Sequence, residues 1–308
     1  MKILCIGDVH LSDTPPSIRT DSYTDDVLDK LAFCVNLAQA QGCQLILQAG
    51  DMFHIKTPSR NSHSLVQRTA HVLTSAQIPV LIVPGNHDMT HDRLDSLRKQ
   101  PLGTLAKVSG IDLLIGPHPE WPVFGIPFLQ DWAELPKWMD AFKKSGKPFL
   151  ATHAPIFPKG EDPIYDYISA PDWASLMGGS GFCLYGHIHD IHGVYDEGGV
   201  TFCNQGAISR GSLHEKTLNR DLSVSIWDSE TGDFTVHPIS FKPPEAVFRL
   251  VEKSGDDFRE AMVQDFVSKA GSTTLVGINM EEVISYAHSQ ELSVPARELV
   301  TSLIEGVA

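Results

Sequence analysis

Short apolar runs alternate with amphipathic segments through the first part of the chain. Residues 2–7, 44–50 and 79–85 are typical of buried strands, and each run ends at a sharp polar turn. Between them, residues 25–41 and 61–76 carry apolar side chains at helical spacing. Strand–helix–strand alternation with nearly continuous apolar strands predicts a largely parallel sheet with helices packed outside it.

The second part of the chain is richer in strands. We expect them at residues 148–153, 182–187, 198–206, 222–228 and 233–239. These strands predict a second sheet packed against the first. The fold class is therefore α/β: a two-sheet β-sandwich flanked by helices.

The pattern changes near residue 242. Segments 256–270, 279–289 and 293–305 have helical character, and this end of the chain is acidic. We therefore expect a large domain over residues 1–242 and a small acidic helical region over 243–308. The latter would be a reduced cap or a docking element for a partner.

Charge and composition narrow the functional classes. A net charge of −14 counts against a nucleic-acid binder that relies on its own basic surface. It leaves a nuclease open, since bound cations neutralise an acidic pocket and a partner can supply basic surface. No apolar run reaches the ~18 residues that a membrane span needs. With five cysteines and no CxxC pair, we expect buried free thiols and a cytoplasmic protein.

Five short stretches follow strand ends and carry Asp, Asn or His. They are GDVH (7–10), GDMFH (50–54), GNHD (85–88), ATHAP (151–155) and GHIH (186–189). Such ligands suit Mn, Fe or Zn, and the glycines allow the backbone to approach a cation closely. In extended backbone, residues at i and i+2 point to the same side. Each stretch alone is ordinary, but together they predict a site of two metal ions that acts on phosphate esters.

The order D-x-H, GD, GNHD, H, GHxH resembles that of the calcineurin-like metallophosphoesterase superfamily over residues 1–240. The resemblance implies two divalent ions, most often Mn, with Mg, Fe or Zn as alternatives, and a metal-bound hydroxide as nucleophile. The implied ligands are Asp8, His10, Asp51 and His189 for one ion and Asp51, Asn86, His153 and His187 for the other, with Asp51 bridging.

The same resemblance implies catalytic roles within GNHD. His87 would stabilise transition-state charge or protonate the leaving group, and Asp88 would orient the His87 imidazole.

Longer segments are similar to the Mre11/SbcD branch of DNA-repair nucleases: GDVHLSDTPPSIRTDSY (7–23), GDMFHIKTPSR (50–60) and PVLIVPGNHD (79–88). This similarity implies a DNA substrate, a partner ATPase of the SbcC/Rad50 type and a contribution of His54 to nuclease activity. A loop histidine that bonds to backbone is the alternative for His54. The chain has no P-loop, so any dependence on ATP would come from the partner.

Some residues depart from that branch or have two interpretations. Gln205 and Ala207 replace the residue types expected after GHIH. A basic cluster of Arg210, Lys216 and Arg220 would either contact a phosphate backbone or form a solvated loop. Around Trp132 and Trp138, core packing is favoured over base stacking.

Three functions remain in competition. The first is a metal-dependent DNA exonuclease or endonuclease that works with an ATPase in DNA repair or recombination. The second is a phosphodiesterase or phosphatase for nucleotides or phosphoproteins, which the acidic charge favours. The third is a scaffold subunit whose metals stabilise the fold. The sequence leaves the oligomeric state open, a homodimer being one alternative.

Overall fold

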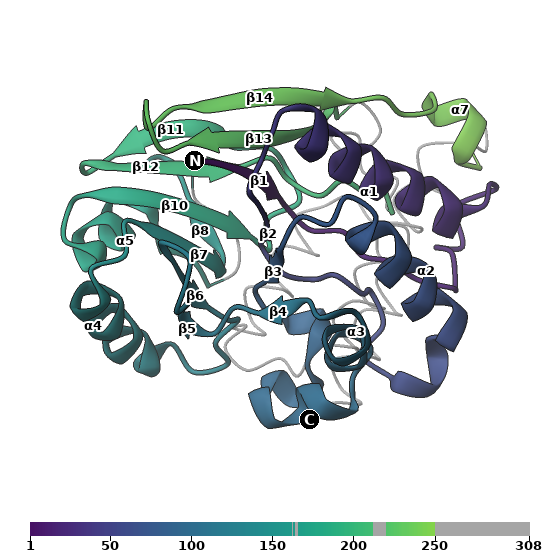
Figure 1. Cartoon of the computed structure of the whole chain (residues 1–308), viewed down its shortest axis with the longest axis horizontal. Helices are drawn as coiled ribbons and strands as arrows, with labels where there is room; N and C mark the ends of the chain where they lie inside the picture. The colour runs from purple at the N-terminus through teal and green to yellow at the C-terminus, as the bar shows by residue number, and fades with distance from the viewer. Residues whose placement is uncertain (162, 164–165, 212–219, 250–308) are drawn as a thin grey trace, which may run out of the picture.

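The structure is a computed structural model that describes residues 1–161, 163, 166–211 and 220–249 (Figure 1). Two six-stranded mixed sheets pack face to face, and helices cover their outer faces. The predicted α/β two-sheet sandwich is confirmed. The three helices predicted beyond residue 250 lie outside the described residues, and the boundary at residue 242 stays a prediction.

The strands of the first sheet, in spatial order, are β14 (Phe234–Ile239), β13 (Leu222–Asp228), β1 (Lys2–Ile6), β2 (Leu45–Gln48), β3 (Val80–Ile82) and β4 (Asp112–Leu113). Those of the second are β11 (Gly193–Glu197), β12 (Val200–Asn204), β10 (Gly181–Gly186), β7 (Phe149–His153), β6 (Val123–Ile126) and β5 (Gly116–Pro117). A further short pair joins β8 (Ile156–Phe157) to β9 (Ile168–Ser169). The sequence pattern missed β4, β5, β6, β8, β9 and β11, which are short or lack an apolar run.

Helices α1 (Tyr23–Ala40), α2 (His63–Thr74) and α3 (Pro101–Ser109) pack on the first sheet, and α4 (Leu135–Ser145) and α5 (Ala170–Met177) pack on the second. Short 3-10 turns lie at η1 (Pro58–Arg60), η2 (Asn86–Asp88), η3 (Thr90–Asp92), η4 (Leu94–Lys99) and η5 (Trp132–Glu134), and α7 (Pro244–Val247) ends the described chain. No helix among these described residues is long and apolar enough to cross a membrane.

Alternation along the central strands creates the layers. Ile3 and Cys5 of β1 point into the core between the sheets, whereas Leu4 and Ile6 point toward the helices of the first sheet. Trp227 of β13 joins the same inter-sheet core. Since strands of both sheets are apolar on both faces, they must be covered on both sides. All five cysteines are buried free thiols, as predicted.

A buried charge network ties α1 to the loop before it. Asp26 accepts hydrogen bonds from Arg19 at 3.0 Å and from Lys30 at 2.7 Å. Burial acts to raise the pKa of Asp26, but the cations of Lys30 and Arg19 outweigh it and hold the pKa below its ordinary value. Its neighbour Asp25 pairs with Arg68 at the surface, where the Asp25 side chain is 54% exposed against 7% for Asp26.

We expect Asp26→Asn to lower the free energy of unfolding by about 3 kcal/mol, because it leaves the buried Lys30 without its counter-charge. Arg19 keeps its ion pair with Asp21. The matched substitution Asp25→Asn should cost less than about 1 kcal/mol, since it removes an exposed ion pair. Urea denaturation of both variants provides the comparison. Equal losses would show that the buried network contributes no more than the surface pair.

Candidate metal centre and active site

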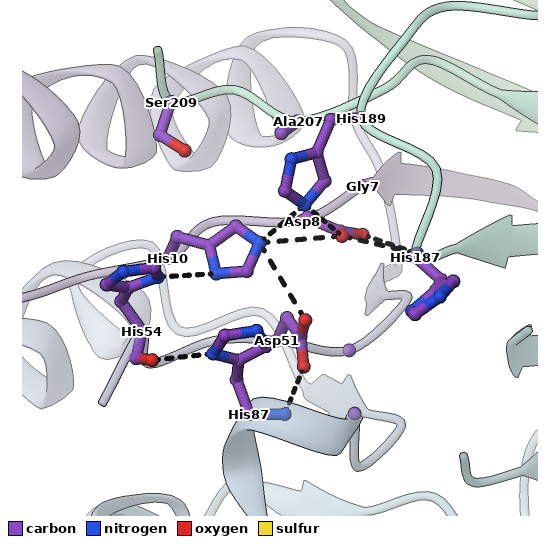
Figure 2. Close-up of polar contacts among 12 residues, drawn as sticks. Gly7, Asp8, His10, Asp51, His54, His87, His187, His189, Ala207 and Ser209 are labelled. Atoms are coloured by element: carbon purple, nitrogen blue, oxygen red, sulfur yellow. Dashed lines mark hydrogen bonds and ion pairs between the residues drawn. The ribbon is translucent and has the colours of Figure 1, made fainter. Parts of the chain in front are cut away.

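Strands of both sheets carry the predicted site residues to one edge of the sandwich. In the first sheet β1, β2 and β3 are mutually parallel, and in the second β7 and β10 are parallel. Their carboxyl ends therefore meet at the same edge. The residues at these ends are Asp8 and His10 after β1, Asp51 after β2, Asn86 after β3, His153 on β7, and His187 and His189 after β10. Figure 2 shows most of them converging.

Asp51 lies at the centre of the site. Its Oδ2 is 3.7 Å from Nε2 of His10 and 3.3 Å from Nε2 of His153, and its Oδ1 accepts the backbone N–H of His87 at 2.8 Å. The residue is only 1% exposed. One carboxylate oxygen, Oδ2, is thus close to an imidazole from each of the two sheets.

A first group of ligand atoms gathers around Asp8. Its Oδ2 lies 3.3 Å from Nε2 of His189 and 3.7 Å from Nε2 of His10. The two imidazole nitrogens are 2.8 Å apart, as the dashed lines in Figure 2 mark. These three ligand atoms lie within 4.8 Å of one another.

A second group gathers around Asn86. Its Oδ1 lies 3.1 Å from Nε2 of His153 and 3.2 Å from Nδ1 of His187. On the other side of its ring, Nδ1 of His153 bonds to the carbonyl oxygen of Ala49 at 2.8 Å, which leaves Nε2 for a ligand. A histidine that binds a metal through one ring nitrogen typically donates a hydrogen bond from the N–H of the other to such a carbonyl.

The donor set fits divalent cations. Carboxylate oxygens, an amide oxygen and imidazole nitrogens converge here. Among the described residues, no lysine or arginine side chain forms an ion pair with these ligand atoms. Such mixed oxygen and nitrogen ligands suit Mn, Fe or Zn. With Asp51 between the two groups, the residues can hold two cations side by side.

Three candidate ligands have strained backbone, as do Gln77, His91 and Asp92 outside the ligand set. His10, Asp51 and His187 have positive φ angles of 54°, 53° and 82°. Residues other than glycine rarely adopt this region, and such strain clusters at functional sites. We expected extended backbone for the pairs Asp8/His10 and His187/His189. The positive φ angles of His10 and His187 show that the backbone is not extended there. Asp8 and His10 still face each other, but His187 and His189 face different groups.

Two glycines show why the motifs begin as they do. Gly50 has a φ of +105°, and a Cβ there would lie 2.4 Å from Nδ1 of His153. A Cβ on Gly85 would lie 2.2 Å from Oδ1 of Asp51. Any side chain at either position would displace a candidate ligand.

His54 and His87 lie beside the first group. Their rings stack with centroids 5.2 Å apart, and Nδ1 of His54 lies 3.4 Å from Nδ1 of His10. Nδ1 of His87 bonds to the carbonyl oxygen of His54 at 2.6 Å. The His54 ring therefore faces the site, and its backbone carbonyl orients His87.

The carboxylate of Asp88 lies elsewhere than the sequence predicted. It accepts backbone N–H groups of Met52 at 3.3 Å, Phe53 at 3.2 Å and Gly85 at 3.0 Å. Burial and the charge of Asp51 raise the pKa of Asp88 to about 7. Asp88 thus joins the GNHD turn to the GDMFH loop through the backbone, while the His54 carbonyl holds the His87 imidazole.

The loop after β12 closes on both histidine motifs despite its departures from the expected sequence. The N–H of Ala207 donates to the carbonyl of His189 at 3.1 Å, and that of Ile208 donates to the carbonyl of Asp8 at 2.9 Å. Gln205 accepts the hydroxyl of Ser223 at 2.7 Å. Backbone groups make the contacts to His189 and Asp8, so the substituted side chains at 205 and 207 do not prevent closure.

The basic cluster is neither a phosphate-facing surface nor a solvated loop at the two positions that the structure describes. Arg210 is 0% exposed and Arg220 is 8% exposed. The Arg220 guanidinium donates to the carbonyls of His189, Ala207 and Ser209. It therefore positions the backbone around His189. Lys216 lies outside the described residues.

Gln48 is a site residue that the sequence patterns did not reveal. Its side-chain amide donates to the carbonyl of Gly7 at 3.0 Å and to that of Gly50. These glycines immediately precede Asp8 and Asp51. A buried glutamine at the end of an otherwise apolar strand was the available signal, because a buried amide needs hydrogen-bond partners.

We expect Arg220→Met to weaken cation binding at the group around Asp8, which includes His189, by about 10- to 100-fold. Loss of a residue that positions a metal ligand typically has an effect of this size. Titration calorimetry with Mn²⁺ measures the effect, and circular dichroism checks that the variant is folded. Arg93→Met is the control, because Arg93 is 68% exposed and pairs with Asp95. A folded Arg220→Met variant with wild-type affinity would contradict the positioning role.

Cation binding should also depend on pH through His153. Burial alone would lower its pKa, but the carboxylates of Asp51 and Asp8 outweigh burial and raise it to about 9. Below that pH the metal-free ring is protonated, and a ligand must be neutral. Mn²⁺ affinity should therefore rise about tenfold per pH unit up to about pH 9.

Calorimetry in buffers of different ionisation enthalpy should detect about one proton released per site filled at neutral pH. In His153→Asn this proton should disappear. Proton release of unchanged size in that variant would assign the titration to another group.

Comparisons with known proteins agree with this geometry. The family model described as calcineurin-like phosphoesterase matches residues 1–238. The "DNA double-strand break repair protein Mre11" of Saccharolobus solfataricus is 28% identical over 196 residues, which are 59% of this chain and 49% of that protein. The protein of the same description from Aeropyrum pernix is 26% identical over 213 residues, which are 61% of this chain and 49% of that protein. The aligned part thus spans about half the length of these relatives.

A solved structure shares the fold. The protein TT1561 of Thermus thermophilus superposes with a TM-score of 0.51 at 15% sequence identity, covering 78% of this chain and 99% of that one. At this identity the likeness concerns the fold alone. The strand-end motifs, the convergence of their side chains and the match over residues 1–238 lead to one conclusion: the chain belongs to the calcineurin-like phosphoesterase family.

Proposed function

We propose that the protein is a DNA nuclease that uses two divalent cations, with manganese as the first choice. One cation would be held by Asp8, His10, Asp51 and His189, and the other by Asp51, Asn86, His153 and His187. The observation that carries the two-cation part of this proposal is the position of the Asp51 carboxylate between His10 and His153. A phosphoesterase of this family uses a dinuclear metal site, and the ligand atoms gathered around Asp8 and around Asn86 support one here.

When bound, the cations supply Lewis-acid stabilisation of charge on the phosphoryl oxygens and activate water at neutral pH. The chain itself holds the acidic and imidazole ligands in place. Asp51 lies between the two groups, and its negative charge reduces the repulsion between two cations.

His87 is the residue that we assign to proton transfer. A carbonyl oxygen only accepts hydrogen bonds, so the contact with His54 places a proton on Nδ1 of His87. Nε2 is then the ring atom available to the substrate. From there a protonated His87 can stabilise charge on the phosphate or protonate the leaving oxygen.

His54 supports a nuclease over a general phosphatase. In the nuclease branch that the GDMFH segment resembles, this histidine contributes to nuclease activity, and here its ring stacks on His87 and approaches His10. The relatives named as DNA double-strand break repair proteins favour DNA as the substrate. From the resemblance of the segments 7–23, 50–60 and 79–88 to the Mre11/SbcD branch, we also propose a partner ATPase of the SbcC/Rad50 type.

The specific alternative is a phosphodiesterase for nucleotides. The net charge of −14 favours a small substrate, because a DNA enzyme that works alone would gain from a basic rim. The same metal ligands serve both functions, so substrate size separates them.

Purified protein incubated with Mn²⁺ and end-labelled single- and double-stranded DNA should degrade the DNA, with and without a candidate ATPase. Asp51→Asn should abolish cleavage, and His87→Ala should slow it about 10²- to 10⁴-fold, as loss of a general acid does. His54→Ala should slow DNA cleavage more than cleavage of a small diester. His71→Ala is the control, since His71 is exposed on α2.

Robust cleavage of small diesters with no action on any DNA end or hairpin would replace the nuclease by the alternative. Wild-type DNA cleavage by His87→Ala would remove His87 from the reaction.

A further inference from the structure

Two aromatic side chains lie beside the second group of candidate ligands. The Phe128 ring centroid is 5.4 Å from that of His187, with the planes 34° apart, and 6.2 Å from that of His153. Trp132 packs edge-to-face on Phe128 at 6.2 Å. Both aromatic residues are half-buried, as is His187. Part of this aromatic pair, Phe128 and Trp132, therefore remains open to solvent next to the site.

The backbone that carries the aromatic pair is fixed to the site. The N–H of Phe128 donates to the carbonyl of Pro84 at 3.0 Å, which joins the loop after β6 to the GNHD turn. The side chain of Asp131 accepts the N–H of Ala133 at 2.9 Å and caps η5, which begins at Trp132. The rings are therefore presented by a short, hydrogen-bonded segment.

The chemistry of this segment selects the ligand. Pro127 and Leu129 are buried and Asp131 is exposed, so the apolar surface that this segment presents is the half-buried Phe128 ring with Trp132 packed on it. The Phe128 ring offers no hydrogen-bond donor to a phosphate, which the cations held beside it would bind. A nucleotide combines a planar base with a phosphodiester. Stacking of a base on an aromatic side chain contributes about 1–3 kcal/mol to binding.

Building on the proposed function, we propose that Phe128, with Trp132 packed against it, is the platform on which the nucleobase beside the scissile phosphate stacks. Trp138 serves a different purpose. It packs on Phe124, with ring centroids 6.5 Å apart, in the apolar core between the second sheet and helices α4 and α5. The core-packing interpretation of the sequence thus holds for both tryptophans, but Trp132 in addition contacts Phe128 at the edge of the site.

Two diesters with the same leaving group separate base recognition from chemistry: thymidine 5′-(p-nitrophenyl phosphate) and methyl p-nitrophenyl phosphate. In Mn²⁺ the wild type should have the higher kcat/KM on the thymidine diester. Phe128→Leu should lower that value about 5- to 150-fold, the equivalent of one stacked base. Its activity on the methyl diester should change less than about twofold, as should both activities of the control Trp138→Leu.

A binding measurement gives a second readout. In Ca²⁺, labelled oligothymidylate should bind the wild type more tightly than an abasic oligomer of equal length, and Phe128→Leu should lose the difference. A parallel fall on both diesters would show that Phe128 merely supports His187 and would overturn the inference. Equal wild-type activity on both diesters would also overturn it while leaving the phosphodiesterase intact. Failure to cleave either diester or DNA would reject the proposed function, and the binding difference would then decide the stacking inference alone.

Discussion

The buried negative charge of Asp51 is the constraint on which the rest of this site depends. A carboxylate that is 1% exposed must be compensated by neighbouring charges or hydrogen bonds. Burial acts to raise the pKa of Asp51, but His153, His87 and His10 outweigh it and hold the pKa well below its ordinary value. Those imidazoles come from three strand ends. The charge of one carboxylate therefore requires the two sheets to meet in a defined arrangement.

The two sheets contribute different kinds of ligand. The first supplies the oxygen ligands Asp8, Asp51 and Asn86 together with His10, and the second supplies His153 and the GHIH histidines. Neither sheet contains a complete site. The inter-sheet core therefore does more than stabilise the fold, because it sets the distance between the oxygen ligands and most of the nitrogen ligands.

Strained backbone at three candidate ligands persists because buried polar side chains hold the loops around it. Gln48 joins the turns before Asp8 and Asp51, and Asp88 joins the GDMFH and GNHD segments. Arg220 holds the carbonyl of His189. These groups touch no reacting atom, yet each is buried and bonded to backbone, where its loss would leave polar groups unpaired. Preorganisation of this kind lets the ligands meet cations without further rearrangement.

Sequence alone determined the period-2 and helical patterns, and hence the two-sheet sandwich and the five strand ends that carry chemistry. These features depend on local residue order and on the rule that parallel strands place ligands at their carboxyl ends. Short strands such as β4 and β5 escaped prediction, since two residues contain no period. Only the tertiary structure decided that Asp88 binds backbone, that Arg220 faces inward and that Phe128 lies against His187. Each of these depends on contacts between residues far apart in the chain, and a charged side chain at a loop position looks the same in sequence whether it is solvated or buried.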